Sequence, residues 1–274
     1  MQLIMFSKTL QDKTLRQLVD YAQRLGIDGY DLAVREGHAV NPENAATELP
    51  KLMKLMRTAG LTVPMVSTAT NLTQTDHPAV RPLLKAMADS SVPLLKIGYF
   101  TFDPTAHDYR TEVTRVRAAF GRWELLAREY QLKICYHTHS NRNMGLNAGS
   151  LAHLLAERDP RSFGAYLDTA HLRIEGEEFD LAVAMLKEHL SIVSLKDVML
   201  TRQQKNDHGS SQRRIVEAGE GMVDWTLVFA TLRGARFDGP LSVHCEFEAE
   251  AAQFEAAVAR EVAFFRRYVA SAEA

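Results

Sequence analysis

The sequence contains only two cysteines, no long apolar run and no marked excess of either charge. Cys135 and Cys245 both fall within apolar, strand-like runs, so we expect reduced, packed thiols and not a disulfide framework. No segment approaches the roughly 20 consecutive apolar residues that cross a bilayer. These absences exclude a disulfide-stabilised scaffold and a membrane-spanning protein.

The small net charge of −2 over 274 residues excludes another group of functions. It provides no general attraction for nucleic-acid phosphates or anionic lipids. The first eight residues lack a basic leader followed by an apolar run, so a cytoplasmic location is expected. We therefore expect a small, neutral or mildly polar substrate, and neither nucleic acid nor membrane as a partner. The sequence leaves the oligomeric state open, a symmetric homo-oligomer included.

A single pattern of helix, glycine and strand recurs along the chain. Its first copy has Asp12 as the expected helix N-cap, apolar residues at helical spacing up to Leu25, and Gly26 before a strand. Counting the opening strand, the pattern predicts eight strands, at residues 3–6, 27–32, 61–66, 93–97, 132–136, 163–167, 192–195 and 241–245.

Strict alternation of strands and helices favours a parallel sheet, and eight repeats favour closure into a single (β/α)8 TIM barrel spanning residues 1–274. A doubly wound open sheet is the alternative, but its Gly-x-Gly-x-x-Gly turn after the first strand is absent. Residues 201–223 are polar and too long for an ordinary connection, so they are either a lid over the barrel mouth or a solvated loop. Asp224 is the expected N-cap of the helix that follows.

Polar side chains gather where the predicted strands end. In barrels of this kind the reacting groups lie at the carboxyl ends of the strands. Alternation places Cys135 and His137 on one face of their strand, and His244 and Glu246 on one face of theirs. The strand ends carry Ser7, Lys8, Asp31, Ser67, Lys96, Tyr99, His137, His139, Asp168, His171, Ser194, Lys196, Asp197, His244 and Glu246.

Imidazoles and carboxylates from the fifth, sixth and eighth strands suit a catalytic divalent metal with nitrogen and oxygen ligands. A lone histidine at a strand end is more often a hydrogen-bonded rim residue than a ligand. Several such residues together are harder to explain that way, because each unpartnered inward polar group costs about 1–3 kcal/mol. The set predicts a metal site.

Four segments of the sequence resemble the xylose isomerase-like barrel family, and the resemblance spans nearly the whole chain. The family includes sugar phosphate isomerases and epimerases, keto-sugar epimerases, inosose dehydratases and a DNA-repair endonuclease branch. The endonuclease branch is disfavoured because the sequence has no basic stripe. The segments are Cys135-Tyr136-His137-Thr138-His139, Leu167-Asp168-Thr169-Ala170-His171, Ser194-Leu195-Lys196-Asp197 and His244-Cys245-Glu246.

The resemblance implies a metal held by Glu, Asp, His and Glu from strands five to eight, with the two glutamates also moving protons. Asp168 and Glu246 match this pattern, as do His171 and Lys196 in their motifs. Two positions depart from the pattern, because His137 stands where a Glu is usual and Ser194 where a His is usual. The implied ligand set becomes His137, Asp168, His244 and Glu246, holding one divalent ion, Mn first and Zn, Co, Fe or Mg as alternatives.

His244 has two placements that the sequence supports equally. It either replaces the missing ligand of strand seven, or lies one layer deeper with hydrogen bonds inside the barrel. His139 is expected to contact the substrate or to act indirectly, not to bind the metal.

By resemblance, the chemistry is proton abstraction beside a carbonyl of a sugar or keto-sugar, as in an isomerase or epimerase. Glu246 is the expected base, and Lys196 or His171 the proton donor or orienting group. Lys8 and Tyr99 are further candidates for substrate contact, with His139. The alternatives are a metal-dependent lyase or dehydratase on a keto-sugar or inosose, since one glutamate is missing, and a barrel that binds a sugar without converting it.

Overall fold

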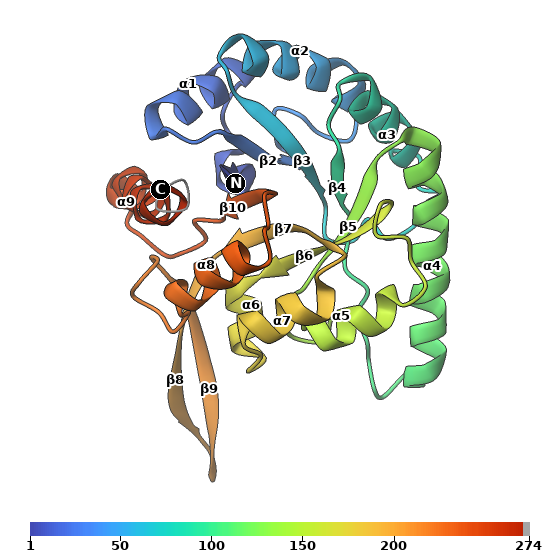
Figure 1. Ribbon diagram of the computed structural model, residues 1–274, viewed down its shortest axis with the longest axis vertical. Helices are drawn as coiled ribbons and strands as arrows, with labels where there is room; N and C mark the ends of the chain where they lie inside the picture. Colours follow the sequence, from blue (N-terminus) through green and yellow to red (C-terminus); the bar gives the residue numbers. More distant parts are fainter. Residues whose placement is uncertain (271–274) are drawn as a thin grey trace.

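Eight parallel strands close into a barrel in the computed structural model, which describes residues 1–270 (Figure 1). Going round the barrel, the order is β1, β10, β7, β6, β5, β4, β3 and β2. The prediction of a (β/α)8 barrel with eight strands is confirmed. The strands are β1 Gln2–Phe6, β2 Gly29–Val34, β3 Thr62–Thr68, β4 Leu94–Lys96, β5 Lys133–His137, β6 Phe163–Asp168, β7 Leu190–Leu195 and β10 Pro240–Val243.

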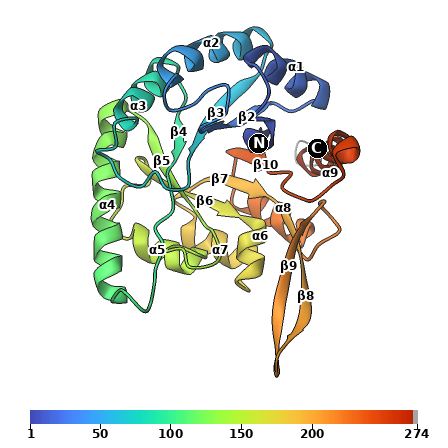
Figure 2. The same ribbon diagram turned by 180° about the vertical axis from the view of Figure 1, so that it is seen from behind.

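Helices surround the barrel on its outer side, as the views from opposite sides in Figures 1 and 2 show. None of the helices that the structure describes is both long and apolar enough to cross a membrane. They are α1 Leu15–Leu25, α2 Ala45–Thr58, α3 Val80–Asp89, α4 Tyr109–Tyr130, α5 Ala148–Leu155, α6 Thr169–Ile174, α7 Phe179–Leu186, α8 Trp225–Gly234 and α9 Ala251–Ala270, with a 3-10 turn at Ser7–Leu10.

Helix α1 shows how local chemistry sets the ends of the elements. Its N-cap is Thr14, not the predicted Asp12, because Thr14 and Gln17 form a capping box in which each side chain binds the other's backbone N–H. At the other end Gly26 has φ 67°, a left-handed conformation that glycine adopts without strain. The predicted N-cap Asp224 of α8 is confirmed, since its side chain accepts a hydrogen bond from the backbone N–H of Leu227.

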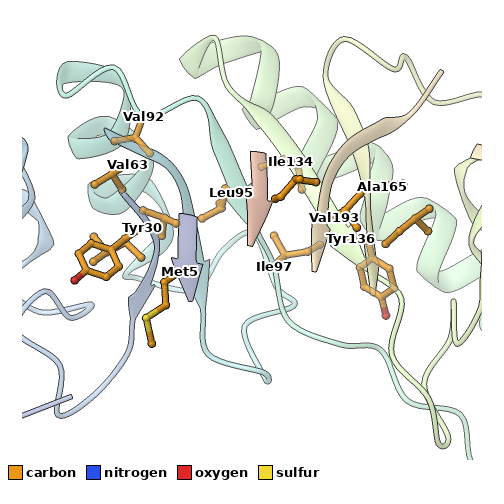
Figure 3. Packing of buried hydrophobic residues seen from close by; sticks show 14 of the residues in the cluster. Met5, Tyr30, Val63, Val92, Leu95, Ile97, Ile134, Tyr136, Ala165 and Val193 are labelled. Carbon is orange, nitrogen blue, oxygen red and sulfur yellow. The ribbon is translucent and has the colours of Figure 1, made fainter. Parts of the chain in front are cut away.

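Alternation along the strands separates two packing environments. Outward side chains fill the layer between strands and helices, where Figure 3 shows Leu95, Ile134 and Val193 from three different strands. Inward side chains form a second, smaller apolar cluster that includes Cys135 and Tyr166. Both cysteines are buried and free, as predicted. The interior of the barrel therefore contains an apolar cluster along the strands and polar side chains at their carboxyl ends.

The predicted lid loop is, over most of its length, a β-hairpin. β8 (Asp197–Lys205) pairs antiparallel with β9 (His208–Val216), and the ribbon projects away from the barrel in both views (Figures 1 and 2). Its outer part is exposed on both faces. Nearer the barrel, Nη1 of Arg213 donates to Oγ of Ser140 at 3.1 Å.

Candidate active site at the strand ends

Side chains at the carboxyl ends of the strands line one pocket at the mouth of the barrel. Seven of the nine predicted site residues contribute to its wall: Lys8, Tyr99, His137, His139, Lys196, His244 and Glu246. The other two, Asp168 and His171, contact Lys196 without lining the pocket. The predicted residues are thus brought together, with two of them behind the wall.

A chain of alternating charges begins at the pocket wall and ends behind it. Nζ of Lys196 lies 2.9 Å from Oε2 of Glu246 and 3.0 Å from Oδ2 of Asp168, so one ammonium bridges two carboxylates. Nζ of Lys8 binds the other oxygen of Glu246 at 2.5 Å. Asp168 also caps the short helix α6 by accepting from the backbone N–H of His171 at 2.9 Å.

These contacts set the protonation states. Burial raises the pKa of Asp168 and of Glu246, but the ammonium of Lys196 and the other neighbouring groups together outweigh it and bring both pKa values well below their usual range. Burial likewise lowers the pKa of Lys196, while the two carboxylates raise it to a net increase. At neutral pH the site therefore holds two carboxylates, Glu246 in the wall and Asp168 behind it, with a fixed ammonium between them.

The histidines of strand β5 and its loop lie beside this chain. Nδ1 of His137 is 2.7 Å from the hydroxyl of Tyr99, and its Nε2 is 3.2 Å from Oδ2 of Asp168. The ring of His139 packs on that of His171 with centroids 3.9 Å apart. Burial lowers the pKa of His137 to about 3, and lowers those of His139 and His171 too. All three are neutral imidazoles near pH 7.

His244 belongs to a hydrogen-bond network inside the barrel. Its Nε2 is 2.8 Å from the hydroxyl of Tyr166, which also donates to Oδ2 of Asp31 at 2.8 Å. Nδ1 of His244 has no hydrogen-bond partner among residues 1–270 and lies 3.8 Å from Oε2 of Glu246. In this structure His244 makes the hydrogen bond inside the barrel that one of the two sequence-based placements expects, and it also lines the pocket.

Glu246 reaches the pocket through an unusual backbone conformation. Strand β10 ends at Val243, and Cys245 has φ 46°, in the left-handed region that non-glycine residues rarely adopt. His244 and Glu246 line the same pocket although both lie beyond the end of β10, with Cys245 between them in this conformation. Such strain is typical of functional sites.

The predicted ligand set does not form a metal site in this structure. A metal needs several donor atoms directed at one point, yet no group of three or more His, Cys, Asp or Glu side chains within residues 1–270 could hold an ion. Asp168 and Glu246 are both bound to the ammonium of Lys196, and Nε2 of His244 faces Tyr166. Apart from Nδ1 of His244, the donors are bound to protein groups, and a fixed positive charge lies between the two carboxylates. The residues do not fit the metal that the resemblance implies.

Several residues in or beside the pocket were not predicted as site residues. Lys96, in the wall, and Asp31, behind it, were noted at strand ends without a role. Tyr166 was placed on the same strand face as Asp168, and Arg35 was considered only as a minor contact to sugar hydroxyls or a phosphate. Alternation was the available signal, since Lys96 lies two residues after the inward Leu94 and Tyr166 two before Asp168.

The chain belongs to the family of xylose isomerase-like TIM barrels, whose family model matches residues 19–268. No curated protein matches the chain in sequence. The predicted family resemblance is confirmed.

Solved structures with the same fold include several carbohydrate enzymes. A 3-keto-D-glucoside 4-epimerase from E. coli superposes with a TM-score of 0.75 at 15% identity, covering 97% of this chain and 99% of that one. A D-psicose 3-epimerase from Clostridium cellulolyticum H10 gives 0.72 at 14% identity, covering 98% and 99%. A probable 3-DHS dehydratase from Bacillus anthracis gives 0.71 at 15% identity, covering 97% and 99%. At these identities the likeness establishes the fold alone.

Proposed function

We propose that this protein is an isomerase or epimerase that removes a proton from the carbon next to the carbonyl of a keto-sugar. The observation that carries the proposal is the pair formed by Glu246 and Lys196 on the pocket wall, 2.9 Å apart. Proton abstraction beside a carbonyl needs a base for the proton and a positive charge for the enolate oxygen. This pair supplies both.

Lys196 serves as the electrophile in this proposal. Its raised pKa keeps the ammonium protonated, and its place in the wall lets it donate to the substrate's carbonyl oxygen. His171 and Asp168 hold it from behind, at 3.4 Å and 3.0 Å from Nζ. His171 is therefore proposed as a positioning residue, in place of the direct role expected from its motif.

Glu246 serves as the base, and Lys8 controls how basic it is. While Lys8 binds Oε1, the carboxylate is a weak base because two ammonium groups stabilise its charge. The side chain of Lys8 is 48% exposed, so a substrate can displace it at small cost. Its departure raises the pKa of Glu246 and frees an oxygen to accept the proton.

The neutral imidazoles of His137 and His139 line the same pocket and are proposed to handle the substrate's hydroxyl groups. His139 is the more accessible one, and Tyr99 packs against it with ring centroids 4.6 Å apart. Epimerisation requires that a proton return to the other face of the carbon. We assign that donation to His139, whose imidazole is then reprotonated by solvent while Glu246 releases the proton it accepted, and Tyr99 holds the sugar beside it.

The names of the structural neighbours support the choice of reaction. A 3-keto-D-glucoside 4-epimerase changes the carbon next to a ketone, which is the chemistry proposed here. The dehydratase among the neighbours marks the second candidate, elimination from a keto-sugar or inosose. One observation favours it: within the described chain, Glu246 is the one carboxylate that lines the pocket, and elimination needs a single base.

Hydrogen exchange with solvent tests the proposal. The protein is incubated with a panel of keto-sugars in D2O, and the proton signals beside the carbonyl are followed by NMR. We expect Glu246→Gln to slow the exchange by about a hundredfold or more, as for loss of a general base. The matched control is Glu248→Gln, an exposed carboxylate two residues along the chain.

The products separate the alternatives. A new epimer or isomer supports the first proposal, and an unsaturated product the second. Binding without exchange or product, for every sugar tested, would leave a sugar-binding barrel. Exchange that is equally fast in Glu246→Gln would overturn the role of Glu246.

The divalent ion implied by the resemblance is tested on the same preparation. Because the carboxylates are bound to Lys196, we expect activity to survive EDTA and elemental analysis to show no stoichiometric metal. About one manganese or zinc ion per chain, lost in Asp168→Ala, would contradict the assignment of the electrophile to Lys196.

A further inference from the structure

Besides Lys196 the pocket contains another buried lysine, Lys96, whose ammonium makes no hydrogen bond within the described residues. Lys96 is the last residue of β4, is 2% exposed, and points into the barrel from the wall of the pocket. Its Nζ makes no hydrogen bond to any residue from 1 to 270, and lies 3.8 Å from the ring centroid of Tyr99. Burying an unpaired ammonium is costly, so Lys96 gains more than an exposed lysine would from a ligand that pairs with its charge.

The nearby carboxylate does not satisfy this lysine by hydrogen bonding. Asp31 is fully buried, but its oxygens accept from the hydroxyls of Ser67, Tyr166 and Ser242, at 2.7, 2.8 and 3.3 Å. Nζ of Lys96 therefore remains directed at the pocket.

Arg35 adds another cation to this part of the pocket. It follows β2, is partly buried and lines the same wall, where its Nε donates to the carbonyl oxygen of Thr68 at 3.2 Å and its guanidinium lies over the ring of Phe6. Its charge is close enough to lower the pKa of Lys96. The like charges stay together although they repel, which favours a ligand that neutralises both.

The balance of charge along the pocket wall points the same way. Four cations line it, and two of these, Lys8 and Lys196, are already bound to Glu246. Lys96 and Arg35 form no salt bridge with a carboxylate of the described residues. The net charge of the whole chain, −2, gives no sign of this local excess.

We propose that Lys96 and Arg35 bind an anionic group of the substrate, so that the substrate is a keto-sugar bearing a carboxylate or a phosphate. The proposal rests on the keto-sugar chemistry assigned above to the same pocket. In the barrel order β4 lies opposite β10, so Lys96 faces the segment that carries Glu246. The sugar then spans the pocket, with its anionic end at Lys96 and its reacting carbon at Glu246.

Proton uptake on binding is a consequence that can be measured. Burial, and then Arg35, lower the pKa of Lys96 to about 7, whereas the charges of Asp31 and Glu246 raise it and that of Lys8 lowers it. Above pH 7 much of the free protein therefore carries a neutral Lys96. A bound anion favours the ammonium, raises the pKa and draws a proton from the buffer.

Calorimetric titration tests the anion site without turnover. The probes are D-fructose, D-fructose 6-phosphate and 5-keto-D-gluconate, each in two buffers of different ionisation enthalpy at pH 7.5. We expect at least one anionic probe to bind about tenfold or more tightly than D-fructose, as for charge-assisted hydrogen bonds, with net proton uptake. Tighter binding of D-fructose 6-phosphate would indicate a site for a phosphate group, and tighter binding of 5-keto-D-gluconate a site for a carboxylate.

Variants then locate the site. Lys96→Met should abolish the preference for the anion and the proton uptake, while D-fructose affinity stays within about twofold. Arg35→Gln, at a partly exposed position, should reduce the preference and carries the test if Lys96→Met does not fold by circular dichroism. Lys54→Met, an exposed lysine of α2, is the matched control and should change nothing.

Equal affinity of wild type for the neutral and anionic probes would overturn the inference, as would an anion preference that survives in both variants. These outcomes are separable from failure of the proposed function. Solvent exchange on neutral keto-sugars without anion preference would leave the reaction standing and remove the anion site. Anion binding at Lys96 without hydrogen exchange would support the anion site and contradict the proposed reaction.

Discussion

At the scale of single residues, Asp168 joins structure to chemistry. It is fully buried, receives hydrogen bonds from the backbone N–H of His171 and from the ammonium of Lys196, and lies 3.2 Å from His137. Its charge both holds α6 in place and balances the lysine that we propose as the electrophile.

Asp168→Asn keeps the size of this side chain and removes its charge. The buried ammonium of Lys196 is then left with Glu246 alone, so we expect the free energy of unfolding to fall by about 3 kcal/mol in urea titrations. In the double variant Asp168→Asn/Lys196→Met most of that loss should be recovered, because no unbalanced charge remains buried. Equal stability of the single variant and wild type would show that the pair is not coupled.

Another residue of the Leu195-Lys196-Asp197 run has a purely structural role. Asp197 is fully buried and accepts hydrogen bonds from the backbone N–H groups of Gly219, Gly221 and Val223 and from Nε1 of Trp225. It ties the connection after the hairpin to the end of β7. From the sequence, Asp197 could not be distinguished from its neighbour Lys196, which lines the pocket.

At the scale of elements, this connection depends on a glycine. A Cβ at Gly221 would lie 2.0 Å from Oδ1 of Asp197, so Gly221→Ala must break the contacts around that carboxylate. We expect the unfolding free energy to fall by about 2 kcal/mol or more, as for other overpacked sites.

Gly234 is the matched control, because a Cβ there would meet no atom within 4 Å. It is the last residue of α8, so Gly234→Ala should leave stability unchanged or raise it by up to about 1 kcal/mol. Thermal and urea unfolding of the two variants would decide, and similar losses in both would contradict the contact at Asp197.

The hairpin β8–β9 is the element that sequence patterns missed. Strand periodicity is readable when one face is buried and the other wet, but most of this ribbon is wet on both. Its polar residues therefore looked like a loop, although its backbone groups pair in a regular ladder from Asp197 to Lys205.

Because the outer hairpin is exposed, the barrel should tolerate its removal. Replacing residues 202–211 with an Asn-Gly turn keeps Arg213 and the base of the ribbon. We expect the urea midpoint to change by an amount equivalent to less than about 1 kcal/mol. A large loss, or loss of the barrel's circular dichroism signal, would mean that the ribbon supports the fold.

At the scale of the whole molecule, a buried carboxyl of the last helix makes stability depend on pH. Glu261 in α9 is 2% exposed and accepts from the backbone N–H of Ala218 at 2.6 Å. Burial raises its pKa to about 8. The folded state therefore holds this proton more tightly than the unfolded state does.

The sign follows from that difference. The contribution of a carboxyl with a raised folded pKa is lost as pH rises from its unfolded value towards 8. Glu261→Gln cannot ionise, so between pH 5 and 8.5 it should lose less stability than wild type, by roughly 2–4 kcal/mol at the upper end. Urea titrations across this range compare the two, and parallel curves would contradict the shift.

The sequence alone determined the barrel, its family and the composition of its mouth. Apolar runs and helical stripes are local signals, because buried strands such as 163–167 and helices such as Tyr109–Tyr130 show their burial in their own residues. Strand ends then place His137, Lys196 and Glu246 at one rim without further information.

Only the tertiary structure decided which of those groups touch. Long lysine side chains reach across several strands, so Lys196 bridges Asp168 and Glu246, whereas Nζ of Lys96 makes no hydrogen bond to the part of the chain that the structure describes. Composition at the rim suggested a metal bound by four donors. Closure of the barrel and the turn at Cys245 instead set the distances, and at those distances an ammonium lies between the carboxylates.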